Sequence, residues 1–245
     1  MQILIGTDKT NFSLKRYSEE FNFLEYQETY KSFVKKKTLK TVRKKVGNNF
    51  SFSIKAPLFI SEETEIIKKF SLNVPQIDKE RLEFYGRFKP TEENKKLTDI
   101  LIKEVENLDA DAVIFYTSNK FYPTPENIKN LNNYFKELGD YFKKDDRDVF
   151  WATLGFWTNE SISQALENTS VISAYDPLMD EIENNSLVNY FIMRGYGRYS
   201  SGYSDTALER LAETIFNKGV DTYVVFQGNY QISNARRFNE IIKYW

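Results

Sequence analysis

The chain has 245 residues, of which 41% are hydrophobic and 28% charged, and its formal net charge is -1. This composition is typical of a globular protein with one large barrel or two small domains. Cysteine and histidine are both absent, which excludes disulfides, thiolate nucleophiles, serine–histidine triads and histidine-rich metal centres. No cofactor is indicated, and a carboxylate site for Mg²⁺ is the one metal site left open.

The sequence predicts no membrane segment. No window approaches the roughly 18 apolar residues that a membrane span needs. The apolar part of the N-terminus, MQILIG, is too short for a signal peptide and is followed at once by charge. We therefore expect a soluble, cytoplasmic protein that does not bind membranes.

Short apolar runs alternate along the chain with longer amphipathic stretches. The apolar runs predict eight strands, at residues 2–7, 22–26, 50–55, 112–116, 149–153, 171–175, 188–193 and 222–226. The amphipathic stretches predict helices at 38–46, 62–69, 93–107, 125–138, 159–166, 205–217 and 233–244. This order predicts an α/β fold, a single (β/α)8 TIM-type barrel with parallel strands and outer helices. We expect one domain over residues 1–245, with an irregular excursion at 72–90.

Polar residues lie at or just after the carboxyl end of each predicted strand. In a parallel barrel these ends converge on one rim, where active sites are built. Glu25 and Asp176 are the candidate catalytic residues. The candidate ligand-binding residues are Asp8, Gln27, Lys55, Tyr116, Arg194, Gln227 and Asn229. Each of them can also be simply the first solvated residue of a loop.

Carboxylates and cations around a shared cavity perturb one another's pKa values, which can create a general acid or base without histidine. The leading hypothesis is a hydrolase- or lyase-like enzyme that acts on a small polar or anionic ligand. Glu25 would be the general base or acid and Asp176 a second carboxylate, while Lys55 and Arg194 would bind the anion. The alternative is a non-catalytic binding or scaffold barrel whose rim side chains are spread apart, or whose rim is plugged by Trp151, Trp157 and Tyr196.

A third hypothesis is association with nucleic acid. Residues 31–45, KSFVKKKTLKTVRKK, are the strongest block of positive charge and could contact phosphates. The same residues can form the solvated face of an outer barrel helix. Residues 194–203, RGYGRYSSGY, could stack on bases or sugars, or could form a glycine-hinged loop over the barrel mouth.

Several motifs, in order along nearly the whole chain, resemble those of the YecE-like family (domain of unknown function 72). They include IGTDKT, FNFLEYQETY, FSFSIKAP, SAYDP and YVVFQGNY…SNARRF. The resemblance implies a TIM barrel whose activity is not established. Glu25 matches the family's strand-2 glutamate, Lys55 begins its Lys-Ala/Val-Pro motif, and Asp176 falls on its aspartate after strand 6.

The chain also departs from the family pattern. Gln27 replaces an asparagine, Tyr116 begins the segment that replaces Gln-Leu/Phe-Pro-Pro, and Trp151 begins the one that replaces the strand-5 Glu-Phe-Arg-His motif. Arg194-Gly195 stands where the family has His-Gly. The departures are concentrated in the second half of the rim, and they favour the non-catalytic alternative if the family's activity needs those residues.

Overall fold

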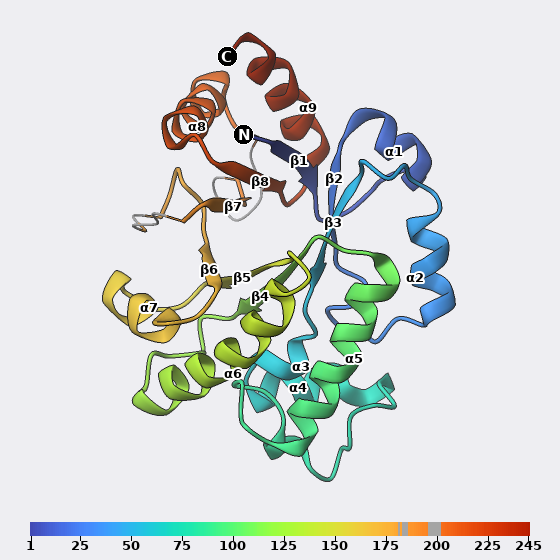
Figure 1. The fold of residues 1–245 in the computed structure, drawn as a ribbon, viewed down its shortest axis with the longest axis vertical. Helices are drawn as coiled ribbons and strands as arrows, with labels where there is room; N and C mark the ends of the chain where they lie inside the picture. Colours follow the sequence, from blue (N-terminus) through green and yellow to red (C-terminus); the bar gives the residue numbers. More distant parts are fainter. Residues whose placement is uncertain (181, 183–185, 196–201) are drawn as a thin grey trace. The chain divides into compact units, whose positions relative to one another are not determined.

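The computed structural model describes residues 1–180, 182, 186–195 and 202–245 (Figure 1). The chain divides into two compact units. Unit 1 comprises Met1–Tyr26, Lys44–Phe52 and Ala174–Trp245, and unit 2 comprises Gln27–Arg43 and Ser53–Ser173. The division passes through two strands, β3 (Ser51–Lys55) and β6 (Val171–Ala174).

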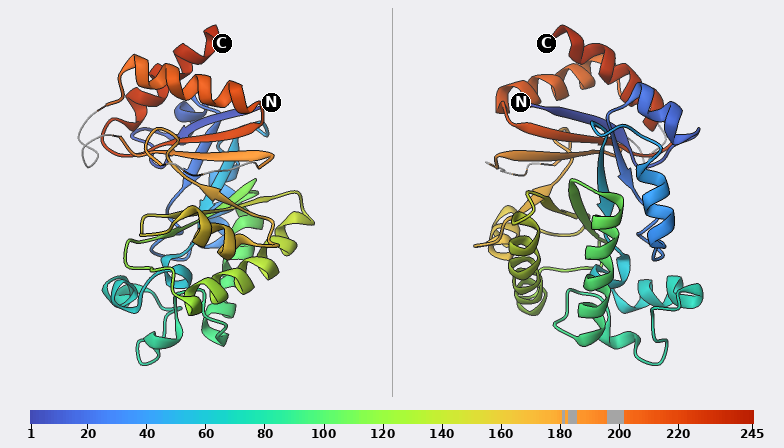
Figure 2. Two further views of the ribbon diagram at one scale, coloured as in Figure 1. Left: turned by 90° about the vertical axis from the view of Figure 1, so that its left-hand side faces the viewer. Right: turned by 45° about the vertical axis from the view of Figure 1, so that its right-hand side comes forward.

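Unit 1 is built on four parallel strands in the order β2-β1-β8-β7. They are β1 (Ile3–Thr7), β2 (Phe23–Tyr26), β7 (Val188–Met193) and β8 (Asp221–Phe226). The helices of this unit are α1 (Leu14–Glu20), α8 (Asp205–Lys218) and α9 (Gln231–Ile241). Helix α9 packs beside α8 and against β1 and β8, so the apolar faces of these elements form the core of unit 1 (Figure 2).

Strands β1 and β2 approach each other closely at Gly6. A Cβ atom on Gly6 would lie 2.0 Å from the carbonyl oxygen of Phe23, so only glycine fits. The buried hydroxyl of Tyr17 on α1 completes this junction. It accepts a hydrogen bond from Thr7 N (2.8 Å) and donates one to Phe23 O (3.0 Å). The Gly6-Thr7 pair therefore sets the distance between the two strands whose ends carry Asp8 and Glu25.

Unit 2 contains the end of β3, then β4 (Ala112–Thr117), β5 (Asp148–Thr153) and most of β6, in the order β6-β5-β4-β3. The pairs β3–β4 and β4–β5 are parallel. The helices of this unit are α2 (Lys36–Arg43), α3 (Leu58–Ser61), α4 (Thr64–Phe70), α5 (Glu92–Leu108), α6 (Pro125–Lys143) and α7 (Asn159–Leu166). Between α4 and α5 the chain forms two short 3-10 turns, Ser71–Asn73 and Leu82–Phe84.

Local sequence signals explain where several helices begin and end. The side chain of Thr124 accepts a hydrogen bond from Asn127 N, and Pro125 occupies the first turn of α6. Ser204 caps α8 in the same way through Ala207 N, and α8 ends at Gly219, whose φ is +65°. These caps fix the helix positions and so the lengths of the loops after the strands.

The predicted alternation of strands and helices is confirmed. The last residue of each of the eight predicted strands lies within one residue of the last residue of the corresponding observed strand. Two helices were missed: α1 is only seven residues long, and α3 is a single buried turn directly after Pro57. The prediction of one domain over the whole chain stays a prediction. Among the described residues, no helix is long and apolar enough to cross a bilayer.

Candidate functional site

In unit 1 the strand register places four polar residues at the same level of the sheet. Thr7 pairs with Leu24 on β2 and with Phe226 on β8, and Phe226 pairs with Met193 on β7. Each of these four residues is followed by a predicted site residue. At this level the chain carries Asp8, Glu25, Gln227 and Arg194. Parallel pairing therefore brings together the carboxyl ends of four strands that are far apart in sequence.

Glu25 lies at the β2 end of this row. It is fully buried and both of its carboxylate oxygens accept hydrogen bonds. Tyr190 donates its hydroxyl proton to Oε2 across 2.8 Å, and Gln227 Nε2 lies 3.4 Å from Oε1. The donors come from β7 and from the residue after β8. A buried carboxylate that is held from two sides has a fixed orientation, which a proton-transfer group requires.

The position of the Tyr190 hydroxyl is set by aromatic packing. The Tyr190 ring stacks on Tyr223 with centroids 5.5 Å apart, and its edge meets Phe23 at 6.2 Å. Tyr223 and Phe23 also contact each other, with centroids 5.2 Å apart. Three rings from β2, β7 and β8 therefore leave the Tyr190 side chain little freedom, so its hydroxyl is directed at Glu25.

Asp176 lies in a second polar group of unit 1, just after β6. It is 2% exposed, Leu178 N donates to its Oδ1 (3.0 Å), and the Tyr203 hydroxyl lies 3.3 Å from its Oδ2. The same hydroxyl accepts a hydrogen bond from Gly195 N (2.7 Å), and Tyr203 N donates to Asn234 Oδ1 (3.2 Å). Tyr203 therefore connects the ends of β6 and β7 to helix α9.

Burial raises the pKa of Asp176 above its ordinary value, because the charged form loses hydration. The backbone N–H groups of Leu178 and Arg194 act in the opposite direction, and the nearby carboxylate of Asp180 adds to the increase. Asp176 thus holds a proton to a higher pH than an exposed aspartate does. A carboxyl group of this kind is suited to act as a general acid.

The remaining predicted residues of unit 1 differ in exposure. Arg194 is half-buried, and its Nη2 atom is buried without a hydrogen-bond partner among the residues that the structure describes. Asp8 is half-buried. With the nitrogen of its side-chain amide facing Asp8, Gln231 donates a hydrogen bond of 2.6 Å to Asp8 Oδ1. Asn229 is exposed in the turn after β8. Arg194 and Asp8 are therefore less buried than Glu25 and Gln227.

Gln27, Lys55 and Tyr116 belong to unit 2. The ammonium group of Lys55 lies over two aromatic rings, 3.9 Å from the centroid of Tyr116 and 4.6 Å from that of Tyr30. The backbone around it is fixed, because Thr29 donates to Lys55 O (2.7 Å) and Tyr30 N donates to Gln27 O (3.0 Å). Cation–π contacts hold the Lys55 ammonium in one direction. The convergence of these residues with Glu25 on one rim stays a prediction.

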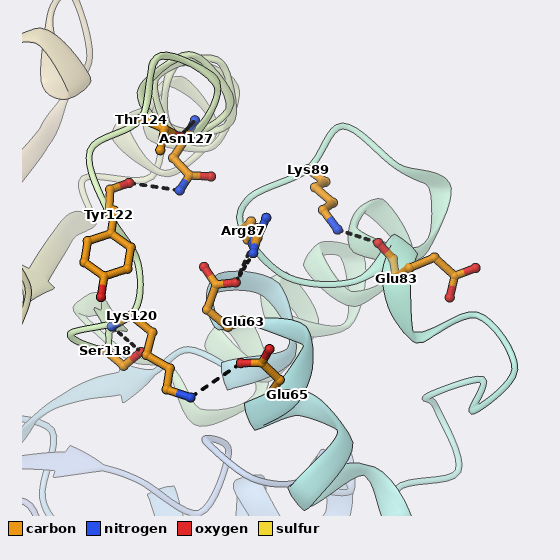
Figure 3. A network of polar contacts seen from close by, with 10 residues as sticks. All are labelled: Glu63, Glu65, Glu83, Arg87, Lys89, Ser118, Lys120, Tyr122, Thr124 and Asn127. Carbon is orange, nitrogen blue, oxygen red and sulfur yellow. Dashed lines mark hydrogen bonds and ion pairs between the residues drawn. The ribbon is translucent and has the colours of Figure 1, made fainter.

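Acidic residues lie around the start of α4. One of them, Glu62, contacts Tyr30, whose ring also contacts the Lys55 ammonium. Burial raises the pKa of Glu62, while Ser118 and the Tyr30 hydroxyl, 3.3 Å from Oε1, act against this increase. The neighbouring carboxylates are paired with cations, as Figure 3 shows: Glu63 with Arg87 and Glu65 with Lys120. Unit 2 therefore has its own buried carboxyl group, which the sequence did not single out.

Two tryptophans pack at the ends of β4 and β5 in unit 2. Trp151 is fully buried and its indole N–H lies 3.2 Å from Thr117 Oγ1. Trp157 meets it edge-on, with centroids 4.8 Å apart, and donates to Phe121 O (2.7 Å). The two tryptophans and Phe121 therefore form an aromatic cluster in this part of the chain. Tyr196, the third residue of the predicted plug, and most of the loop 194–203 lie outside the described residues.

A cleft in unit 2 is lined by none of the predicted site residues. It has a volume of about 390 Å³ and lies between α5 and α6, where Thr98, Tyr134 and Tyr141 line it. Metal sites need clusters of ligating side chains, and no group of three or more Asp or Glu residues suited to a metal is found in the described part of the chain.

Sequence reasoning missed Tyr190, Tyr203 and Gln231, which hold the predicted carboxylates. Tyr190 lies within a strand and Tyr203 precedes a helix, so neither is at a strand end. The only signal for Tyr190 was a polar hydroxyl inside an otherwise apolar run, because a buried tyrosine hydroxyl usually has a partner.

The model of a family described as "Protein of unknown function DUF72" matches residues 5–244. The chain belongs to this family. It is the YecE-like family that the sequence motifs indicated. A search of curated proteins found no match.

Several solved structures are also similar to this chain. A DUF72 family protein from Enterococcus faecalis is 16% identical with a TM-score of 0.69, and the alignment covers 99% of this chain and 98% of that one. The corresponding protein from Thermotoga maritima is 14% identical with a TM-score of 0.67, covering 99% and 100%. A sugar phosphate isomerase/epimerase from Parabacteroides distasonis is 13% identical with a TM-score of 0.54, covering 100% and 96%. At these identities the similarity establishes the fold, so this DUF72 chain is a (β/α)8 TIM-type barrel of parallel strands.

Proposed function

We propose that this DUF72 chain is a hydrolase- or lyase-like enzyme that acts on a small polar or anionic molecule at the strand ends of unit 1. The observation that carries the proposal is the buried carboxylate of Glu25, with a Tyr190 hydroxyl at 2.8 Å and a Gln227 amide at 3.4 Å. The donors orient a group that would otherwise be costly to bury. We place this activity in the cytoplasm on the sequence grounds given above.

The two carboxyl groups have different surroundings, which suits them to different roles. Glu25 accepts hydrogen bonds on both oxygens and is the candidate general base. Asp176, whose pKa is raised by burial, is the candidate general acid. Arg194 is the candidate anion-binding residue of this unit, because its guanidinium can form a bidentate contact with a carboxylate or phosphate. The sugar phosphate isomerase/epimerase among the similar structures is consistent with a substrate of this chemical class.

The burial of Glu25 has a consequence for how the ligand binds. Because Glu25 is fully buried while Arg194 and Asp8 are half-buried, an anionic group contacts Arg194 first. A ligand that reacts at Glu25 has to displace a group that contacts the carboxylate, and the Gln227 amide (3.4 Å) makes a weaker contact than the Tyr190 hydroxyl (2.8 Å).

The proposal is tested by turnover of chromogenic substrates, p-nitrophenyl phosphate, acetate and glycosides, with the purified full-length chain. We expect one class to be hydrolysed, and Glu25→Gln to lower kcat by about 10²–10⁴-fold, as loss of a general base does. Glu28→Gln is the matched control, because Glu28 is exposed in the next loop. Circular dichroism and the midpoint of urea unfolding show whether each variant is folded.

The outcomes separate the two classes of hypothesis. Full activity in folded Glu25→Gln would contradict the proposed role of this residue. No turnover of any substrate, together with a small anion found bound by native mass spectrometry and lost in Arg194→Gln, would instead identify a non-catalytic binding barrel. The effect of EDTA on the rate tests Mg²⁺, the one metal that the sequence left open.

A further inference from the structure

The longest stretch of the chain without an acidic residue forms a surface that the proposed enzyme site does not use. Between Glu28 and Glu62 there is no Asp or Glu, and residues 31–45 contain eight of the 34 cationic side chains. The structure places the first part of this stretch on helix α2 and on the loop before it, in unit 2. We define the lysine surface as Lys31, Lys35, Lys36, Lys37 and Lys40 together with Lys68 and Lys69 of α4.

A single aromatic ring joins the two parts of the lysine surface. The ammonium of Lys31 lies 4.7 Å from the ring centroid of Phe70, at the end of α4, and that of Lys69 lies 5.5 Å from it. Both cations are held on one ring although they come from different elements. The loop before α2 and the last turn of α4 therefore bring basic side chains together at Phe70.

Internal ion pairs do not neutralise this patch. All seven lysines are exposed, and none forms an ion pair in the part of the chain that the structure describes. Two carboxylates at the start of α4 pair with other cations, Glu63 with Arg87 and Glu65 with Lys120 (Figure 3). The positive charge of the surface is thus available to a ligand.

The position of the lysines is unfavourable for the stability of α2 alone. Lys36 and Lys37 are its first two residues, and no acidic residue lies in its first turn. Positive charge at a helix N-terminus opposes the helix dipole. A bound anion reverses the sign of this interaction, because it meets both the lysines and the N-terminal end of the dipole.

The chemistry of the surface favours a phosphodiester backbone over a lipid bilayer. Leu39 is the only buried residue of α2. The helix packs against α5 within unit 2. No large apolar side chain is exposed between Lys31 and Arg43, and close in sequence to Lys68 and Lys69 only Leu72 is, so the surface offers little that could insert among acyl chains. An array of lysine ammonium groups on an exposed helix is a suitable partner for successive phosphates, which it contacts without reading sequence.

From these observations we infer that the lysine surface of unit 2 binds the phosphate backbone of nucleic acid, independently of the carboxylate site of unit 1. Binding is electrostatic, releases counterions and shows no sequence preference. The four to six phosphate contacts that seven lysines can supply correspond to a loss of affinity of about 10²–10³-fold between about 50 and 200 mM salt.

The test is fluorescence anisotropy of a labelled DNA duplex of about 24 base pairs, titrated with the full chain over this salt range. The variant carries Lys36→Gln, Lys37→Gln and Lys40→Gln. The matched control carries Lys129→Gln, Lys136→Gln and Lys143→Gln, which remove the same charge from exposed positions on α6. We expect the α2 variant to make the slope of log K against log salt shallower by about 2.7, and the control to leave it unchanged.

The α2 variant should unfold at the same or a higher urea concentration than the wild type, since two of its lysines oppose the helix dipole. Weak binding therefore cannot be attributed to loss of the fold. Absence of duplex binding at about 50 mM salt would overturn the inference. Equal losses in both triple variants, or binding to phosphatidylserine vesicles without binding to the duplex, would overturn it as well.

Discussion

Glu104 provides a quantitative prediction of how stability depends on pH. This α5 residue is 2% exposed, and its Oε1 accepts a hydrogen bond from Val34 N (2.5 Å). Its Oε2 is buried without a partner among the described residues. Burial raises the pKa of Glu104 to about 8, and the hydrogen bond from Val34 only partly opposes this increase. The native protein therefore keeps a proton at neutral pH that the unfolded chain releases.

This bound proton determines whether the free energy of unfolding rises or falls with pH. The carboxyl group has a pKa of about 4.3 in the unfolded chain, so between about pH 5 and 8 folding takes up one proton. The contribution of Glu104 to stability is fully present below the unfolded pKa and decreases by about 1.4 kcal/mol for each pH unit up to about 8. Between about pH 6 and pH 9 the free energy of unfolding should fall by about 2–3 kcal/mol because of Glu104.

Urea unfolding at these two pH values measures the effect. Glu104→Gln keeps an acceptor for Val34 N and cannot ionise, so the variant should lose about 2–3 kcal/mol less than the wild type over this range. Glu137→Gln, at an exposed position on α6, is the control and should follow the wild type. A parallel loss of stability in wild type and Glu104→Gln would refute the reasoning.

Three other substitutions test local features of the fold. Gly6→Ala should lower the free energy of unfolding by about 1–3 kcal/mol, because its Cβ would lie 2.0 Å from Phe23 O; a neutral effect would show that the strands can separate without cost. Tyr17→Phe removes the hydroxyl bound to Thr7 N and Phe23 O and should cost about 1–3 kcal/mol in urea unfolding, with Phe23 packing unchanged. Thr124→Ala removes the N-cap of α6 and should cost about 1 kcal/mol; a loss no greater than that of exposed Thr206→Ala would contradict the capping role.

The strands could be predicted because their signal is local. Runs such as AVIFYT and TYVVF are buried on both faces and are bounded by polar residues, so each predicted end lies within one residue of the observed end. Helix α1 was missed for a physical reason. Tyr17 is its only buried residue, so there is no repeated apolar spacing, and its one clear local signal is the Ser13 cap.

The candidate site could be predicted only in part. Strand ends identified Asp8, Glu25, Arg194 and Gln227, which the register places at one level. The partners that hold them depend on packing between distant segments. Glu62 and Glu104 illustrate the same limit, because a glutamate in sequence gives no sign that it will be buried with a raised pKa.

Glu25 shows what the three-dimensional arrangement adds to a strand-end carboxylate. Its donors are 165 and 202 residues away in sequence, and both are neutral groups, a phenol and an amide. A Tyr190→Phe or Gln227→Leu substitution would remove one of these two donors from the buried carboxylate, and the lost contact would add to the cost of keeping it out of water. A substitution in the three-ring cluster of Phe23, Tyr190 and Tyr223 that shifts the Tyr190 ring would therefore also shift the hydroxyl that contacts the carboxylate of Glu25. This connection explains how substitutions on β7 and β8 can alter a residue of β2, and it makes the second half of the chain as important for Glu25 as the strand that carries it.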